Sequence, residues 1–282
     1  MKTTKKILIT IILATLVFVG AVVAYYVYDA HFRLRDEPIA QEVVETPYDA
    51  ADEPASIITE TPAVEDDYAD CDYYDDYEEP VDLTPFLDLI AAFNDAREQT
   101  GNDDIVAYIS IPDTNVNYPV VQAGDNIFYL HHDIRRVNSA AGAIFLDYLN
   151  SPDFTDPNTI IYGHNMRGGI KFNNLRNYVF GDRTQSFLQE HPHIIIITEY
   201  EVLIYEIFSV FTTHIEFEYI QVDFVDDEFA ELVDEIIRRS YHDTGVTATD
   251  EDNVLILSTC TNIDRDTRIV VASRLMERLL IW

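Results

Sequence analysis

Residues 253–275 read NVLILSTCTNIDRDTRIVVASRL, two apolar, β-branched runs joined by a polar loop. Cys260 closes the first run and Arg268 opens the second. Two short apolar runs separated by a polar loop predict a β-hairpin. Pairing of the two strands would bring the Cys260 thiol and the Arg268 guanidinium to one end of a sheet. A thiol that acts there needs a base, which must come from elsewhere in the chain.

Short apolar runs of the same kind recur through the chain after residue 100. The candidate strands cover residues 105–111, 116–122, 143–147, 159–162, 193–198, 202–212, 254–259 and 269–275. Many short strands broken by Pro, Gly and Asn turns are typical of a barrel or a sandwich. The fold class is therefore expected to be mainly β.

Two segments show helical rather than alternating spacing of apolar residues. Residues 83–99 carry the apolar positions Phe86, Leu87, Ile90 and Phe93. Thr84 is the candidate N-cap of this helix, and Gly101 stands where it should end. Residues 227–240 place Phe229, Leu232, Val233, Ile236 and Ile237 on one face. We expect one helix before the strands and one long helix between the sixth and seventh strands.

The chain is strongly acidic, with a formal net charge of −33 over 282 residues. Such a charge repels the phosphates that a nucleic-acid-binding protein must neutralise, so no nucleic acid is expected as a partner. The acidic residues are densest in residues 29–82, which are rich in Pro and Thr and show no sustained apolar period. We expect this segment to be a disordered, self-repelling linker. A calcium site is the alternative, but the segment lacks the glycine-punctuated spacing of a calcium loop.

The N-terminus has the pattern of a membrane anchor. Residues 1–6 carry three lysines, and residues 7–28 form an apolar, uncharged run long enough to cross a bilayer as a helix. The lysines favour a cytoplasmic tail at 1–6 and an extracellular domain at 83–282. A cleaved signal peptide is the alternative, but its apolar region would be shorter and would end in small residues. We therefore expect a single-pass protein of the cell membrane.

Of the two cysteines, Cys260 lies in the context better suited to catalysis. Carboxylates such as those around Cys71 make a thiol a poor nucleophile, so Cys71 is expected to be a bystander. A thiol becomes reactive when an imidazole takes its proton, and an arginine can stabilise the oxyanion that forms on an attacked amide. A Cys, a His and an Arg brought together are therefore a complete set for acyl transfer.

Eight histidines could supply the base. They are His31, His131, His132, His164, His191, His193, His214 and His242. Composition does not choose among them, but His164 in IIYGHNM (residues 160–166) directly follows an apolar run and sits in a glycine-flanked turn. Such a turn can be open to a substrate. The two closely spaced histidine pairs lack metal-site spacing, so neither a metal nor another cofactor is expected.

At this point the ordered segments resemble a known family. IIYGHNM, then LSTC (residues 257–260) and RIVV (residues 268–271), resemble the sortases, surface transpeptidases of Gram-positive bacteria, and most of all class B. YPVVQ at 118–122, DNIFYL at 125–130 and GAIFLD at 142–147 extend the resemblance, which runs from about residue 83 to residue 275. It implies an eight-stranded sortase β-barrel with an N-terminal helical extension and a long helix between strands six and seven.

The resemblance also implies roles for single residues. Cys260 matches the nucleophile, His164 the general acid/base and Arg268 the transition-state arginine. Arg265 is the alternative arginine, but Arg268 directly precedes the strand, as the family arginine does. The positions that match the substrate cleft are Asn126, Leu130, Tyr162, Tyr219, Ile220 and Ser258. For Leu130 and Ile220 a place in the core is the alternative.

The implied function is that of a membrane-anchored cysteine transpeptidase without a cofactor. It would cleave a C-terminal sorting motif of a secreted protein, hold that protein as a thioester on Cys260, and pass it to an amine of a cell-wall peptide. A pilin-polymerising sortase, with a pilin lysine as acceptor, is the nearest alternative. A conventional cysteine protease and a non-catalytic surface scaffold are the others.

Overall fold

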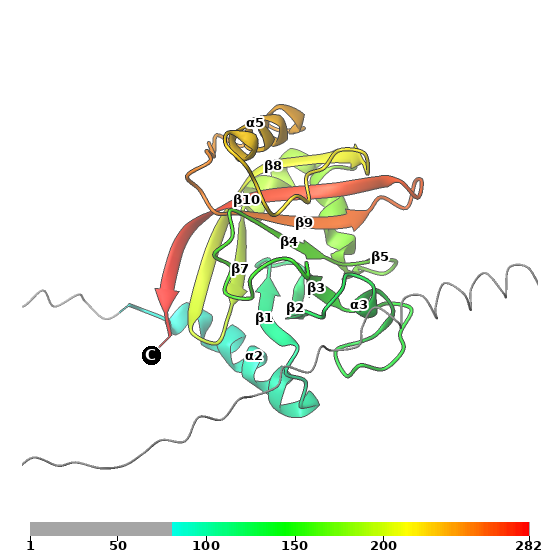
Figure 1. Ribbon diagram of the computed structural model, residues 1–282, viewed down its shortest axis with the longest axis vertical. Helices are drawn as coiled ribbons and strands as arrows, with labels where there is room; N and C mark the ends of the chain where they lie inside the picture. The colour runs from blue at the N-terminus through cyan, green and yellow to red at the C-terminus, as the bar shows by residue number, and fades with distance from the viewer. Residues whose placement is uncertain (1–80, 282) are drawn as a thin grey trace, which may run out of the picture. The chain divides into compact units, whose positions relative to one another are not determined.

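The computed structural model describes residues 81–281, shown as a ribbon in Figure 1. The strands are β1 (Ile105–Ser110), β2 (Asn117–Val121), β3 (Ile144–Leu146), β4 (Asn158–Tyr162), β5 (Asn165–Met166), β6 (Ile170–Lys171), β7 (His193–Ile197), β8 (Glu201–His214), β9 (Val254–Cys260) and β10 (Thr267–Leu280). The helices are η1 (Thr84–Phe86), α2 (Leu87–Thr100), α3 (Phe128–His131), η2 (Phe172–Tyr178), α4 (Thr184–Glu190) and α5 (Glu228–Arg239).

Eight of these strands close a barrel in the order β1-β2-β3-β4-β9-β10-β8-β7, and β5 and β6 form a separate hairpin. The mainly β fold and the eight-stranded barrel are thus confirmed. Each of the eight candidate strands is a strand of the barrel. The short elements α3, β5, β6, η2 and α4 were not expected from the sequence, because none is long enough to show a periodic pattern.

The expected hairpin is β9 and β10, and its first strand is covered on both faces. Leu255 and Leu257 belong to the core inside the barrel. Val254 and Ile256 point the other way and pack with α5. All four side chains are at most 1% exposed. A strand buried on both faces carries a continuous apolar run in place of an alternating one.

The long helix α5 lies between the sixth and seventh barrel strands, β8 and β9, as expected. Phe229, Val233 and Ile236 bury its apolar face against the outside of the barrel wall. Ile237, at the edge of the predicted apolar face, is 37% exposed. Figure 1 shows α5 over β8 and β10, with α2 on the other side of the barrel.

The N-terminal helical extension is also present, but it begins differently from the expectation. Thr84 opens a short 3-10 turn, and the α-helix starts only at Leu87. The backbone N–H of Thr84 bonds to the Asp82 carboxylate at 2.9 Å, so Thr84 does not act as a side-chain cap. Phe93 packs α2 against the barrel, and Gly101 ends the helix in the left-handed conformation that favours glycine.

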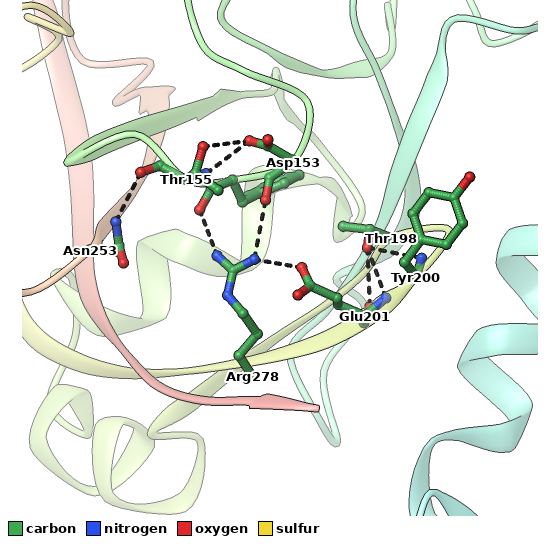
Figure 2. Close-up of polar contacts among 8 residues, drawn as sticks. Asp153, Thr155, Thr198, Tyr200, Glu201, Asn253 and Arg278 are labelled. Atoms are coloured by element: carbon green, nitrogen blue, oxygen red, sulfur yellow. Dashed lines mark hydrogen bonds and ion pairs between the residues drawn. The ribbon is translucent and has the colours of Figure 1, made fainter. Parts of the chain in front are cut away.

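A polar cluster fastens the far end of β10, which runs to Leu280 (Figure 2). Arg278 of β10 forms an ion pair with Glu201 of β8. Its guanidinium also donates to the carbonyl oxygens of Asp153 (3.5 Å) and Phe154 (3.0 Å) in the loop before β4. This cluster therefore ties that loop to the ends of two barrel strands.

The membrane localisation expected from the sequence requires correction. Among residues 81–281, no helix is long and apolar enough to cross a membrane. The longest helix in that range, α2, has 14 residues, which gives a length of about 21 Å against a hydrocarbon core of about 30 Å. Residues 1–80 lie outside the described part of the chain. They include the expected tail (1–6), the expected anchor (7–28), Cys71 and all of the expected linker (29–82) except its last two residues. We withdraw the membrane location and the membrane as a partner.

Candidate active site

Three neighbouring strands, β4, β9 and β10, bring the candidate catalytic side chains together. Arg268 of β10 is directly opposite Cys260 of β9 in the antiparallel ladder, and opposite residues project from the same face of a sheet. On the other side, β4 runs parallel to β9 and its last pair is Tyr162 with Ser258. Continuing this register by two residues sets His164 beside Cys260. Cys260 thus lies between the histidine turn and Arg268 in the order of the strands.

Hydrogen bonds on both sides of His164 fix its turn to the end of β9. Before the histidine, the Thr259 hydroxyl donates to the carbonyl of Gly163 at 2.6 Å. After it, the side-chain amide of Asn165 donates to the carbonyl of Cys260 at 2.8 Å. The histidine therefore sits in a short bridge whose two ends are bound to the cysteine and its neighbour.

Asn165 is itself held from two sides. Its side-chain oxygen accepts a hydrogen bond from Asn173 at 2.6 Å, and its backbone carbonyl accepts one from Asn262 at 2.8 Å. Asn165 is only 8% exposed, so water cannot readily replace these partners. The three asparagines join the histidine turn, η2 and the loop after Cys260 into one hydrogen-bonded unit.

The carbonyl oxygen of Leu130 orients the His164 ring. Nε2 lies 2.9 Å from that oxygen, so Nε2 carries a proton and Nδ1 is the basic nitrogen of the neutral ring. Gly142 makes this contact possible. A Cβ at Gly142 would lie 2.7 Å from the Tyr129 carbonyl oxygen, 2.8 Å from the Leu130 oxygen and 3.1 Å from His164 Cδ2. A larger residue there would displace the histidine or its partner.

Arg268 and Arg265 differ in where they lie. The Nη1 group of Arg268 donates to the carbonyl oxygens of Arg265 (2.7 Å) and Thr267 (3.3 Å), which holds the guanidinium across the end of the hairpin. Within residues 81–281 Arg268 forms no ion pair, so no local carboxylate neutralises its charge. Arg265 is exposed and lies outside the cavity described next.

A cavity of about 330 Å³ opens over these groups. It is lined by all of the residues singled out from the sequence: His164, Cys260, Arg268, Asn126, Leu130, Tyr162, Tyr219, Ile220 and Ser258. Phe145, Gly163, Ile215, Phe217 and Thr259 complete the lining. Leu130 is half-buried and Ile220 is 44% exposed, so neither is a plain core residue. A volume of this size is within the range of ligand sites.

Tyr219 forms a buried part of the cavity wall near the thiol. Its hydroxyl and that of Ser258 lie 2.8 Å apart and share a hydrogen bond. Burial raises the pKa of Tyr219, and the hydrogen bond with Ser258 and the charge of Arg268 oppose that rise. The phenol is therefore neutral near pH 7 and contributes a hydroxyl rather than a charge.

Two polar residues of this region were missed in the sequence. Asp147 is 3% exposed and accepts hydrogen bonds from Asn126 and Tyr162, each at 2.8 Å. Burial first, and then the Asp147 carboxylate, raises the pKa of Tyr162 well above its ordinary value. Asn165, described above, is the second residue that was missed. The only sequence signals for them were the GAIFLD segment, which ends at Asp147, and the position of Asn165 next to His164.

Within residues 81–281 no three potential ligands are grouped to hold a metal ion. His132 and His191, from the two histidine pairs of the sequence, each hydrogen-bond to a backbone carbonyl oxygen, at 2.8 Å and 3.0 Å. The His132 ring thus bonds within its own segment, to Phe128, and the His191 ring bonds to Pro112 in the loop after β1.

Comparison with known proteins adds an independent line of observation. A family model described as the sortase domain matches residues 109–276. Sortase B of Listeria monocytogenes is 38% identical over 183 residues, which cover 63% of this chain and 72% of that protein. Sortase B of Staphylococcus aureus is 34% identical over 179 residues, which cover 62% of this chain and 72% of that protein.

Solved structures agree with the sequence comparison. The Staphylococcus aureus sortase B–substrate complex matches with a TM-score of 0.61 and 30% identity, covering 69% of this chain and 89% of that chain. The sortase B of Bacillus anthracis in complex with AAEK2 matches with a TM-score of 0.59 and 36% identity, covering 65% of this chain and 83% of that chain. Sequence and fold therefore point to the same group of proteins.

Proposed function

The chain belongs to the sortase family, class B, whose members are cysteine transpeptidases, and from that premise we propose that Cys260, His164 and Arg268 form its active site. One observation supports the proposal: the strand order β4-β9-β10 brings Cys260 between the histidine turn and Arg268, and all three residues line one cavity. Residues 83–282 are the catalytic domain in this proposal.

In the first step Cys260 attacks a sorting motif near the C-terminus of a secreted protein. The Cys260 thiolate adds to the carbonyl carbon of a Thr in the motif, and the carbonyl electron pair moves onto oxygen. Arg268 stabilises this oxyanion, because among residues 81–281 its charge has no counter-ion and only its Nη1 group is engaged in hydrogen bonds. The C–N bond then breaks, the amine leaves with the proton of the His164 imidazolium, and a thioester remains on Cys260.

In the second step an amine takes the acyl group. The amine nitrogen adds to the thioester carbonyl and gives its proton to His164, and the C–S bond breaks to regenerate the thiolate. A cell-wall peptide is the proposed acceptor, and attack by water gives hydrolysis instead. A pilin lysine as acceptor would follow the same steps with a different second substrate.

The remaining predicted residues are proposed to bind the sorting motif. The six residues are Asn126, Leu130, Tyr162, Tyr219, Ile220 and Ser258, and all of them line the cavity with the catalytic three. Leu130 and Ile220 offer apolar contacts, while the others offer hydrogen-bonding groups. A half-exposed Cys260 in this lining is accessible to a peptide, unlike the buried thiol of a non-catalytic scaffold.

The test uses the full chain, a library of peptides that each contain a Thr before the candidate scissile bond, and an added amine. Mass spectra should reveal cleaved peptide, amine-linked peptide and a peptide adduct on Cys260, all absent in Cys260→Ala. Arg268→Ala should lower kcat far more than Arg265→Ala. Retained cleavage in Cys260→Ala, or the reverse order of the two arginines, would contradict the assignment. Products formed with cell-wall amines but not with lysine amines would identify the acceptor class.

A further inference from the structure

A buried carboxylate lies directly behind the wall of the substrate cleft. Asp147 follows β3, is 3% exposed, and forms no ion pair within residues 81–281. Burying a charge without a counter-ion is costly unless several donors satisfy it. Three donors do so: the Leu149 N–H at 2.9 Å, the Asn126 side-chain amide at 2.8 Å and the Tyr162 hydroxyl at 2.8 Å.

The backbone holds Asp147 rigidly in this place. Its N–H donates to the carbonyl of Ile160 at 2.9 Å, which continues the ladder between β3 and β4. Its own carbonyl accepts hydrogen bonds from the Gln122 side chain at 2.8 Å and from the Asn150 N–H at 3.1 Å. The carboxylate therefore has a fixed position from which it can orient other side chains.

Two of the three donors line the cavity, and Asp147 determines what each offers to a ligand. The Asn126 side-chain oxygen accepts from the Tyr148 N–H at 3.0 Å, so its orientation is unambiguous. One amide hydrogen of Asn126 bonds to Asp147, and the second has no partner within the described part of the chain, residues 81–281. Tyr162 gives its only hydroxyl proton to Asp147, so its oxygen can act toward the cavity only as an acceptor.

We propose that Asp147 is a positioning residue that sets the hydrogen-bonding polarity of the substrate cleft. Tyr162 then presents an acceptor for an N–H group, and Asn126 presents a donor for a C=O group. The matching ligand chemistry is an amide, either the backbone of an extended peptide or a side-chain carboxamide. This inference rests on the proposed function and adds to it the chemical reason why the cleft accepts a peptide.

The decisive substitution is Asp147→Asn, which keeps the size of the side chain and removes one acceptor. Its new NH₂ group must face either the Leu149 N–H or the Asn126 amide, so one donor meets another donor. Asn126 and Tyr162 both donate to Oδ2 of Asp147, so an NH₂ group at that position also deprives Tyr162 of its acceptor, and the tyrosine then turns its proton toward the cavity. Asp182→Asn is the matched control, because Asp182 is exposed, outside the cavity lining, and carries the same charge.

The expected result is a split between the kinetic constants. For a peptide selected from the library, Asp147→Asn should raise KM at least tenfold and change kcat less than threefold, relative to Asp182→Asn. The rate at which iodoacetamide alkylates Cys260 should stay the same, because Asp147 contacts none of the catalytic three. Tyr162→Phe should also raise KM, and Asp147→Asn should raise KM less in that background than in the wild type, since one of the shared hydrogen bonds is already lost.

Replacing amides by esters along the peptide separates positioning from plain stability. An ester lacks the N–H, so at one position it should raise KM in the wild type and have less effect in Asp147→Asn. If Asp147→Asn does not fold, Tyr162→Phe with the ester series gives the same test. A KM within twofold of the control, or an equal fall in kcat, would overturn this inference while leaving the thioester chemistry intact. Absence of any Cys260 adduct in the wild type would overturn both.

Discussion

Asn165→Ala should damage catalysis although Asn165 does not line the cavity. Asn165 donates to the carbonyl of Cys260 at 2.8 Å and accepts from Asn173 at 2.6 Å. Alanine removes both bonds and leaves a carbonyl oxygen and an amide without partners, next to the histidine turn. The change therefore tests whether the bridge between His164 and Cys260 is needed for the reaction.

The magnitude follows from the two bonds. A buried group left without its partner costs about 1–3 kcal/mol, and Asn173 is half-buried, so water can partly replace its partner. The loss should be about 2–4 kcal/mol in the free energy of unfolding, which lowers Tm by about 5–12 °C in a domain of this size. A reacting group misplaced by about 1 Å can cost about 100-fold in rate, so kcat should fall 10- to 100-fold with a smaller change in KM.

The assay combines calorimetric Tm with peptide cleavage at 25 °C and alkylation of Cys260. Asn173→Ala removes one of the two bonds and should give roughly half the stability loss. Asn165→Asp keeps an acceptor for Asn173 but loses the donor to Cys260, so its kcat should fall nearly as far as in Asn165→Ala. Asn177→Ala is the control, because Asn177 is exposed. An unchanged kcat in Asn165→Ala, with Tm lowered as expected, would show that the bridge stabilises the fold without positioning the catalytic pair.

Three further changes test other parts of the structure. Gly142→Ala puts a Cβ 2.8 Å from the Leu130 oxygen at a φ of 57°. Strain of about 1–2 kcal/mol and loss of the His164 orientation should lower kcat at least tenfold, and an unchanged kcat would count against this. Arg278→Ala leaves the Glu201 carboxylate, whose side chain is 17% exposed, without its ion-pair partner. The free energy of unfolding in urea should fall by about 2–4 kcal/mol, and kcat should stay unchanged, since neither residue lines the cavity. A drop in kcat would mean that the cluster influences the site. Burial raises the pKa of Tyr178 in the folded state. Its contribution to stability is therefore complete below the unfolded pKa of about 10 and is lost as pH rises above it. Tyr178→Phe should reduce the fall in the free energy of urea unfolding between pH 10 and 11 by about 1 kcal/mol, and an identical slope would refute this.

The barrel strands could be predicted because their ends carry local signals, whereas their full lengths could not. β10 was expected to end at residue 275, but it continues to Leu280. Charged residues in this part of the strand look like a loop in the sequence. In the barrel Arg278 lies opposite Leu203 of β8 and forms an ion pair with Glu201 of the same strand. Charges that pair across strands therefore extend a sheet in a way that no single segment shows.

The residues of the candidate site also fall into those that the sequence could predict and those that it could not. Cys260 and Arg268 lie in one hairpin, so their meeting could be predicted from one segment. His164 reaches Cys260 only through the parallel pairing of β4 with β9, which has no local signature, and its selection needed the glycine-flanked turn and the family resemblance. Asn165 was missed because its partner Cys260 lies 95 positions away in the chain. Asp147 was missed because only the folded barrel brings Asn126 and Tyr162, from different elements, to its carboxylate.

The intact mass of the full chain after incubation with a library-selected peptide tests the central claim most directly. The account predicts a mass increase equal to the acyl part of the peptide, located on Cys260 by fragmentation and released by hydroxylamine as a thioester should be. The increase should be absent in Cys260→Ala and strongly reduced in His164→Ala and Arg268→Ala. A peptide adduct on any other residue, or cleavage and transfer that persist in Cys260→Ala, would contradict it.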